Sequence, residues 1–155
     1  MNYLKTLSMV SFCCLAGCSS GFESFTSQGQ ILPVTAKALV GEKVIDLEVT
    51  KTLQQRDLGL MYRTFLPENR GMLFEVDPPT STAFWMKNCK IPLDMIFLRD
   101  NIVTKVEVAA PPCVVEPCPL YTSDVPFDRV IEIQGRSSLK LGIKAGSRID
   151  VVFLN

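Results

Sequence analysis

Histidine is absent from this chain of 155 residues. Histidine is the commonest metal ligand and the commonest general base near neutral pH, so the usual forms of both kinds of site are missing. Serine–histidine catalytic sets and the H-E-x-x-H zinc motif are excluded. We therefore expect no metal and no cofactor, and we expect binding rather than catalysis.

The chain also lacks an excess of charge of either sign. Its 16 lysines and arginines balance its 16 aspartates and glutamates, and the formal net charge is zero. No basic stripe or tail is present, although proteins that bind nucleic acids need one to meet the phosphate backbone. We expect a monomer with no nucleic-acid partner.

The N-terminal segment contains an apolar run, residues 7–15, that follows Lys5 and is too short to span a bilayer. The next residues, 15–18 (LAGC), resemble the lipobox of bacterial lipoproteins. This resemblance implies cleavage before Cys18, a diacylglycerol on its sulfur and an acylated amino terminus, which together anchor a protein stably. An ordinary secretory signal with a chance cysteine is the alternative.

These features predict a signal peptide over residues 1–17, a lipidated flexible tether over 18–30 and a single β-rich domain over 31–155. The tether is polar and contains glycine and serine, a composition typical of flexible linkers. The expected location is outside the cytoplasm, on the periplasmic side of a bacterial membrane. Serine rather than aspartate follows Cys18, which permits sorting to an outer membrane.

Three cysteines lie in the expected domain. Outside the cytoplasm, Cys113 and Cys118 are expected to form a disulfide across a short loop. Cys89 is left over, as a buried thiol, a reactive thiol or a competing partner for one of the other two.

The domain reads as mainly β. Alternation of apolar and polar residues predicts one hairpin over residues 31–49 and another over 94–109, with a tight turn at Asp100-Asn101. A short helix capped by Thr50 or Thr52 is expected to run to about Leu60, and residues 77–80 (DPPT) are expected to form a loop. The pattern favours a single-domain antiparallel β-sandwich or barrel with one or two short helices.

Residues 84–96 (FWMKNCKIPLDMI) contain the only tryptophan and place polar side chains between two apolar strands. Pro92 cannot donate to a strand ladder, so the polar residues are expected at a corner beside Trp85. Such a corner suits a small-molecule site. A core tryptophan with a solvated turn is the alternative.

Four segments together carry a resemblance to a known family: residues 56–63 (RDLGLMYR), 71–74 (GMLF), 84–88 (FWMKN) and 91–95 (IPLDM). With Cys113, Cys118 and Tyr121 they resemble the domain of unknown function 192 family over about residues 40–154. The resemblance implies a compact, mostly-β domain, often exported, with no established activity. Cys89 stands where many members carry threonine, which leaves the cysteine pairing open.

The first hypothesis for function is a binding module for a small ligand such as a carbohydrate or a cell-wall fragment. Tryptophan and tyrosine offer flat surfaces for a sugar, and a few polar groups orient it. The candidate ligand-binding residues are Arg56, Trp85, Lys87, Asn88, Asp94 and Tyr121.

Several alternatives stay open. Arg56 and Asp94 are equally suited to a structural salt bridge. A hydrolase could use Lys87 with Asp94, or Asp94 with Glu75 or Asp77. An accessory lipoprotein that binds another envelope protein is also compatible with the sequence. A soft-metal site is disfavoured because the remaining methionines lie in apolar runs that suit core packing, namely Met61, Met72, Met86 and Met95.

Overall fold

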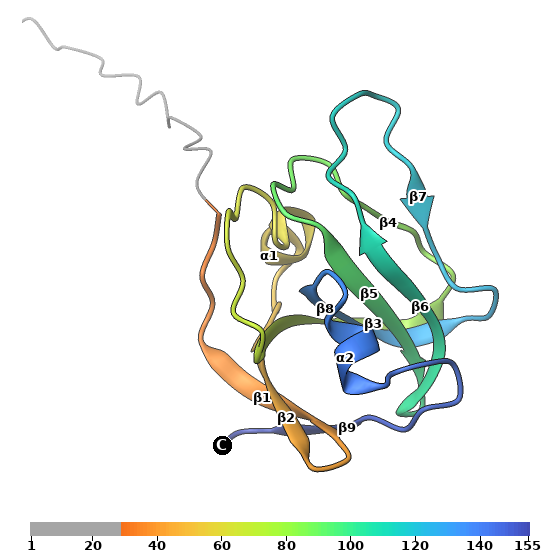
Figure 1. The fold of residues 1–155 in the computed structure, drawn as a ribbon. Helices are drawn as coiled ribbons and strands as arrows, with labels where there is room; N and C mark the ends of the chain where they lie inside the picture. Colours follow the sequence, from red (N-terminus) through yellow and green to blue (C-terminus); the bar gives the residue numbers. More distant parts are fainter. Residues whose placement is uncertain (1–28) are drawn as a thin grey trace, which may run out of the picture.

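The computed structural model describes residues 29–155 (Figure 1). The predicted signal peptide, the lipidation site at Cys18 and nearly all of the tether lie outside the described residues. The elements are β1 (Val34–Val40), β2 (Lys43–Val49), α1 (Leu53–Leu58), β3 (Arg70–Thr80), β4 (Phe84–Trp85), β5 (Leu93–Arg99), β6 (Ile102–Ala110), β7 (Leu120–Tyr121), β8 (Phe127–Gln134), α2 (Ser137–Leu141) and β9 (Asp150–Phe153).

Seven strands form one sheet in the order β6-β5-β8-β3-β2-β1-β9, and β4 pairs with β7 in a separate two-stranded ribbon. This confirms the mainly β fold with two short helices. The predicted antiparallel pairing holds for every neighbouring pair except β2 and β3, which run parallel. The parallel pair needs a crossover connection, and residues 50–69, which include α1, supply it.

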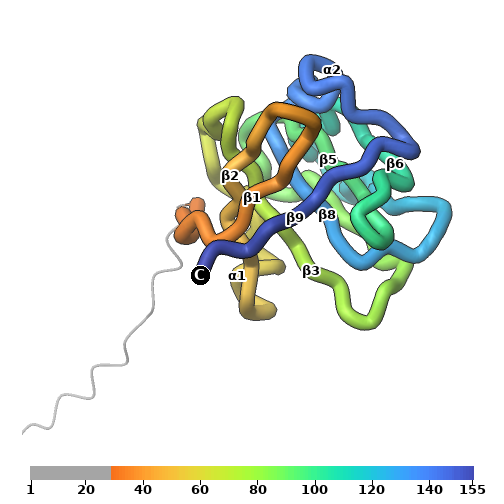
Figure 2. The backbone as a smooth tube through the Cα atoms, turned by 90° about the horizontal axis from the view of Figure 1, so that it is seen from below, coloured from red at the N-terminus to blue at the C-terminus, as the bar shows by residue number. Residues whose placement is uncertain are grey.

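The large sheet curls until its two ends meet. Figure 2 shows β9 running beside β1. At the other edge, the start of β6 contacts the chain that leads into β9. Val103 N donates to Ser147 O at 2.9 Å, and Gly146 N donates to Val103 O at 2.8 Å. These bonds join the edges, so the barrel alternative is the one that the structure adopts.

The central strands β3, β5 and β8 are buried on both faces. Along β5, Ile96 and Leu98 enter the core inside the curled sheet, whereas Met95 and Phe97 enter a second core outside it. The β4–β7 ribbon covers this outer core. Phe84 of β4 packs edge-on against Phe97, with ring centroids 6.1 Å apart.

Two local predictions can be compared with the structure directly. The Asp100-Asn101 turn is confirmed, with φ of 52° and 66°. Residues 77–80, expected as a loop, belong to β3. The strand bows away from β8 after Glu75 and pairs with it again where Thr80 lies opposite Phe127. The prolines thus lie where no ladder bond is required. Within residues 29–155, neither helix is long and apolar enough to cross a membrane.

Candidate functional site

A cleft of about 940 Å³ lies on the outer side of the sheet. It is lined by the end of α1 and the following turn (residues 56–61), by β3 (74–78) and by the segment entering β4 (82–85). Thr80, Cys89 and Glu132 complete the lining. Its lining mixes apolar and aromatic side chains with polar and charged ones, and such a mixed concave surface can both bind and orient a ligand.

Glu132 is the unexpected residue of this cleft. It lies in β8 between Met72 of β3 and Met95 of β5, both fully buried, and it is itself only 5% exposed. Within the described part of the chain, its carboxyl group has no hydrogen-bond or ion-pair partner, and its oxygens are not among the fully enclosed polar atoms that lack one, so they remain open to the cleft. Burial raises its pKa from 4.5 to about 8, so the acid is protonated near neutral pH.

Glu132 is not among the candidate residues predicted from the sequence, although the apolar pattern of β8 singles it out. Ile131 and Ile133 point into the inner core, and Val130 points into the outer core. Strand alternation therefore turns Glu132 toward the outer core as well. An acidic residue at a position that is apolar on both flanks is a candidate functional group.

Cys89 lies in the same cleft as a free, buried thiol. Burial, and to a smaller extent the nearby Glu132 carboxylate, raise the pKa of the thiol to about 12. The neutral thiol is a poor nucleophile. Of the three roles left open for Cys89, the structure shows the buried thiol, which is not paired with Cys113 or Cys118. Cys113 and Cys118 form the expected disulfide.

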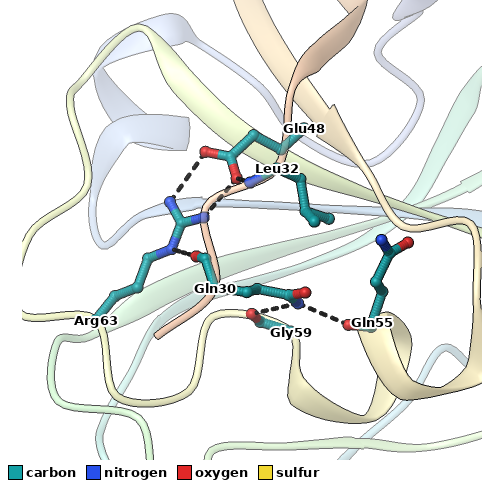
Figure 3. A network of polar contacts seen from close by, with 6 residues as sticks. All are labelled: Gln30, Leu32, Glu48, Gln55, Gly59 and Arg63. Carbon is teal, nitrogen blue, oxygen red and sulfur yellow. Dashed lines mark hydrogen bonds and ion pairs between the residues drawn. The ribbon is translucent and has the colours of Figure 1, made fainter. Parts of the chain in front are cut away.

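Polar contacts hold the α1 wall of the cleft in place (Figure 3). The Gln30 side chain donates to Gln55 O at 2.7 Å and to Gly59 O at 2.9 Å. Arg63 donates to Gln30 O at 2.8 Å and forms a buried, two-pronged ion pair with Glu48 of β2. Gln30 was expected in the flexible tether, but these bonds make it part of the domain.

Trp85 is 45% exposed and lines the cleft, so the core-tryptophan alternative does not hold. The Nζ atom of Lys87 lies 5.3 Å from the centre of its ring. The same Nζ pairs with Glu116 at 2.9 Å, and this contact lowers the pKa of Glu116. Lys87 thus packs beside Trp85, outside the cleft lining. Arg56 does line the cleft, where its guanidinium donates to Glu75 O at 3.4 Å.

Asp94 lies on the opposite face of the sheet from the cleft. It is fully buried, and its carboxylate accepts hydrogen bonds of 2.7 Å from the backbone N–H groups of Ala109, Arg136 and Ser138. Alternation along β5 explains this placement, because Asp94 shares its parity with Ile96 of the inner core. The structure therefore corrects three ideas: Asp94 is a structural residue, it does not pair with Arg56, and it does not meet Lys87.

The remaining two candidates also support the scaffold. Asn88 adopts a positive φ of 57°; its carbonyl accepts from Tyr62 N at 2.9 Å, and its amide contacts Met61 Sδ at 3.9 Å. Tyr121 pairs with Phe84 in the ribbon and packs on the outer core. Partial burial, and secondarily a nearby carboxylate, raise its pKa. Neither residue lines the cleft.

The prediction of no metal site stays a prediction. Among residues 29–155, no group of three or more histidine, cysteine, aspartate or glutamate side chains is placed to hold an ion. Met72, Met86 and Met95 are fully buried in the outer core, which is the packing role expected of them.

The fold and the cleft define a class, a curled β-barrel domain with an outer ribbon and a cleft beside it. The model of the DUF192 family, described as an uncharacterized ACR, matches residues 35–151, and the chain belongs to this family. This confirms the resemblance drawn from the sequence motifs. No curated protein matches the chain.

Two solved structures are similar to the chain. A protein of unknown function from Novosphingobium aromaticivorans is 32% identical, with a TM-score of 0.67, over 75% of this chain and 83% of that chain. A candidate transcription regulator from Sinorhizobium meliloti is 27% identical, with a TM-score of 0.65, over 79% of this chain and 98% of that chain. Both similarities extend over most of the domain.

Proposed function

We propose that this protein is an exported, lipid-anchored binding protein that takes a small ligand into the cleft beside β4. The observation that carries the proposal is Glu132, a largely buried carboxyl group that lines the cleft and has no hydrogen-bond partner among residues 29–155. Because Glu132 is only 5% exposed, its carboxyl group is poorly solvated in the free protein. A ligand that hydrogen-bonds to it replaces this poor solvation and gains affinity.

The walls suit a ligand with an apolar or flat body. Phe74, Phe84 and Trp85 line the cleft, and Trp85 is open to solvent on part of its surface. Aromatic rings bind the apolar faces of sugars and other ring systems. A carbohydrate or cell-wall fragment remains a candidate ligand. Binding is favoured over hydrolysis, because Asp94 is engaged by backbone N–H groups and Lys87 by Glu116.

The proposed location rests on the lipobox and on the disulfide. A disulfide such as the one between Cys113 and Cys118 forms and persists in an oxidising compartment. In the proposal, acylated Cys18 holds the domain at the periplasmic side of a bacterial membrane, where envelope-derived ligands are found.

A second proposal, an accessory lipoprotein that binds another envelope protein, draws on the ribbon end of the molecule. Val114 and Val115 of the disulfide loop are exposed, and so is Leu120 beside Trp85. An exposed apolar group of this kind is typical of protein contact surfaces.

The test is a fluorescence titration of the purified chain with cell-wall fragments and simple sugars. Trp85 is the sole tryptophan, so its emission reports on the cleft. We expect a saturable change that Glu132→Gln weakens by about tenfold or more, while Glu42→Gln, in the exposed β1–β2 turn, behaves as the parent chain. Unaltered affinity in the Glu132→Gln variant, with its fold intact, would remove the cleft from the proposal.

A further inference from the structure

We propose that the cleft selects organic cations, that is, small molecules that join a protonated amine to an apolar body, with the ammonium group bound by Glu132. This inference rests on the proposed function and names its ligand class. It follows from three observations on the lining: the partnerless buried carboxyl group, the balance of charge at the mouth and the aromatic walls.

The charged groups of the lining are predominantly acidic. Asp57 of α1 and Asp77 of β3 are exposed in the lining, Glu132 lies deeper, and Arg56 is the cation among its residues. The Arg56 guanidinium is held toward the backbone of β3 by its bond to Glu75 O. A concave surface with an excess of one sign raises the local concentration of ligands of the opposite sign. The mouth therefore favours cations over anions.

Glu132 supplies the matching group inside. An ammonium group has donors and no acceptor, and a carboxylate has only acceptors, so the two are complementary in both hydrogen bonding and charge. The side chains around Glu132 offer no competing cation: its register neighbours Met72 and Met95 are apolar, and Cys89 stays a neutral thiol. The carboxyl group thus lacks only a charged partner.

Binding of an amine must then release a proton. In the free protein Glu132 is protonated near pH 7, since burial raises its pKa to about 8. The ammonium group stabilises the ionised form, the carboxyl O–H bond breaks, and its proton passes to solvent while the ligand keeps its own charge. A neutral hydroxylated ligand would instead hydrogen-bond to the protonated acid with no proton released.

The aromatic walls accept such a ligand. Phe74 and Phe84 offer apolar surface to the ligand body. The Trp85 ring already receives an ammonium group, that of Lys87, at 5.3 Å from its centre. The electron-rich face of an indole attracts cations in this way.

The experiment compares matched probes on the full-length chain purified in detergent. Phenethylamine, 2-phenylethanol and phenylacetate share a body and differ in charge, and a second set is built on a cyclohexyl body. Calorimetric titration at pH 7 in phosphate and in the zwitterionic buffer MOPS separates proton release from binding heat. We expect the amines to bind about tenfold or more tighter than the alcohols, with close to one proton released.

Glu132→Gln should lose both the amine preference and the proton release. Asp57→Asn should reduce affinity less and keep the proton release, because Asp57 acts only at the mouth. A thermal melt confirms that each variant is folded.

The outcomes separate this inference from the proposed function. Alcohols or cell-wall sugars that bind as well as the amines overturn the cation selectivity and leave the binding function in place. Amine binding that is unchanged in Glu132→Gln overturns the role of Glu132. Amine binding that is lost in Glu132→Gln but releases no proton overturns the protonated state of the free carboxyl group and leaves the amine selectivity in place. If neither the probes nor the cell-wall fragments bind the folded chain, both proposals are wrong.

Discussion

Glu132 and Asp94 show how much a single carboxyl group depends on its surroundings. Both lie in central strands and are almost fully buried. Asp94 accepts three backbone hydrogen bonds and so stabilises the junction of β5, β6 and α2. Among residues 29–155 no backbone N–H group donates to the Glu132 carboxyl group in this way, and its charged form is unfavourable in the free protein. Buried groups that lower stability are characteristic of functional sites.

The substitution Glu132→Gln tests how much the buried carboxyl group lowers the stability of the fold. Because the folded chain holds the Glu132 proton up to a pKa of about 8 and the unfolded chain releases it near 4.5, the folded state binds more protons between these values. The free energy of unfolding therefore falls as pH rises from 4.5 to 8, by about 5 kcal/mol at most.

The glutamine variant lacks this titration. We expect it to be more stable than the parent at pH 8 and to show a flatter stability profile. Urea unfolding at pH 5 and pH 8 measures the difference. Parallel profiles for the two proteins would show that Glu132 is ionised in the folded state.

At the scale of elements, α1 is the part of the cleft wall that depends most on contacts with the rest of the domain. It has six residues, none of them buried, and a helix of that length is unstable alone. Thr52 caps it through a reciprocal pair with Gln55, and Gln30 binds its last turn. The position of the cleft wall thus depends on the polar network that includes Arg63 and Glu48.

Arg63→Met is expected to destabilise the fold by about 3–5 kcal/mol, because it leaves the buried Glu48 carboxylate without its counter-charge. Adding Glu48→Leu should recover part of the loss. Urea unfolding of the single and double variants measures both effects. The exposed Lys140–Glu68 pair is the control; removing it with Lys140→Met should change little, since exposed pairs contribute little. Equal effects at the two pairs would contradict this assignment.

At the scale of the whole molecule, the proposed anchor sets where the cleft meets its ligands. Cys18→Ser removes the sulfur that would carry the diacylglycerol. The variant is expected to leave the membrane fraction, because each buried methylene contributes about 0.8 kcal/mol to membrane binding. Immunoblots of membrane and soluble fractions provide the measurement, with Ser20→Ala as the matched control. A Cys18→Ser protein that stays with the membrane would exclude the lipid anchor.

Local patterns in the sequence determined the hairpins, the short capped helix, the Asp100-Asn101 turn and the disulfide. Each of these features depends on residues that are close together in the chain, so their spacing in the sequence is enough to predict the local geometry. The family motifs determined the fold for the same reason, since they are short segments in a set order.

The cleft was decided by the tertiary structure. The alternation of side chains along a strand shows which residues share a face with Asp94 in β5 and with Glu132 in β8. Both faces of these strands are buried, however, so the sequence pattern does not show which face carries the cleft. That depends on the distant β4–β7 ribbon and on α1, which cover the outer face only in part. Pairing of segments far apart in the chain therefore left Asp94 in the scaffold and Glu132 in the cleft.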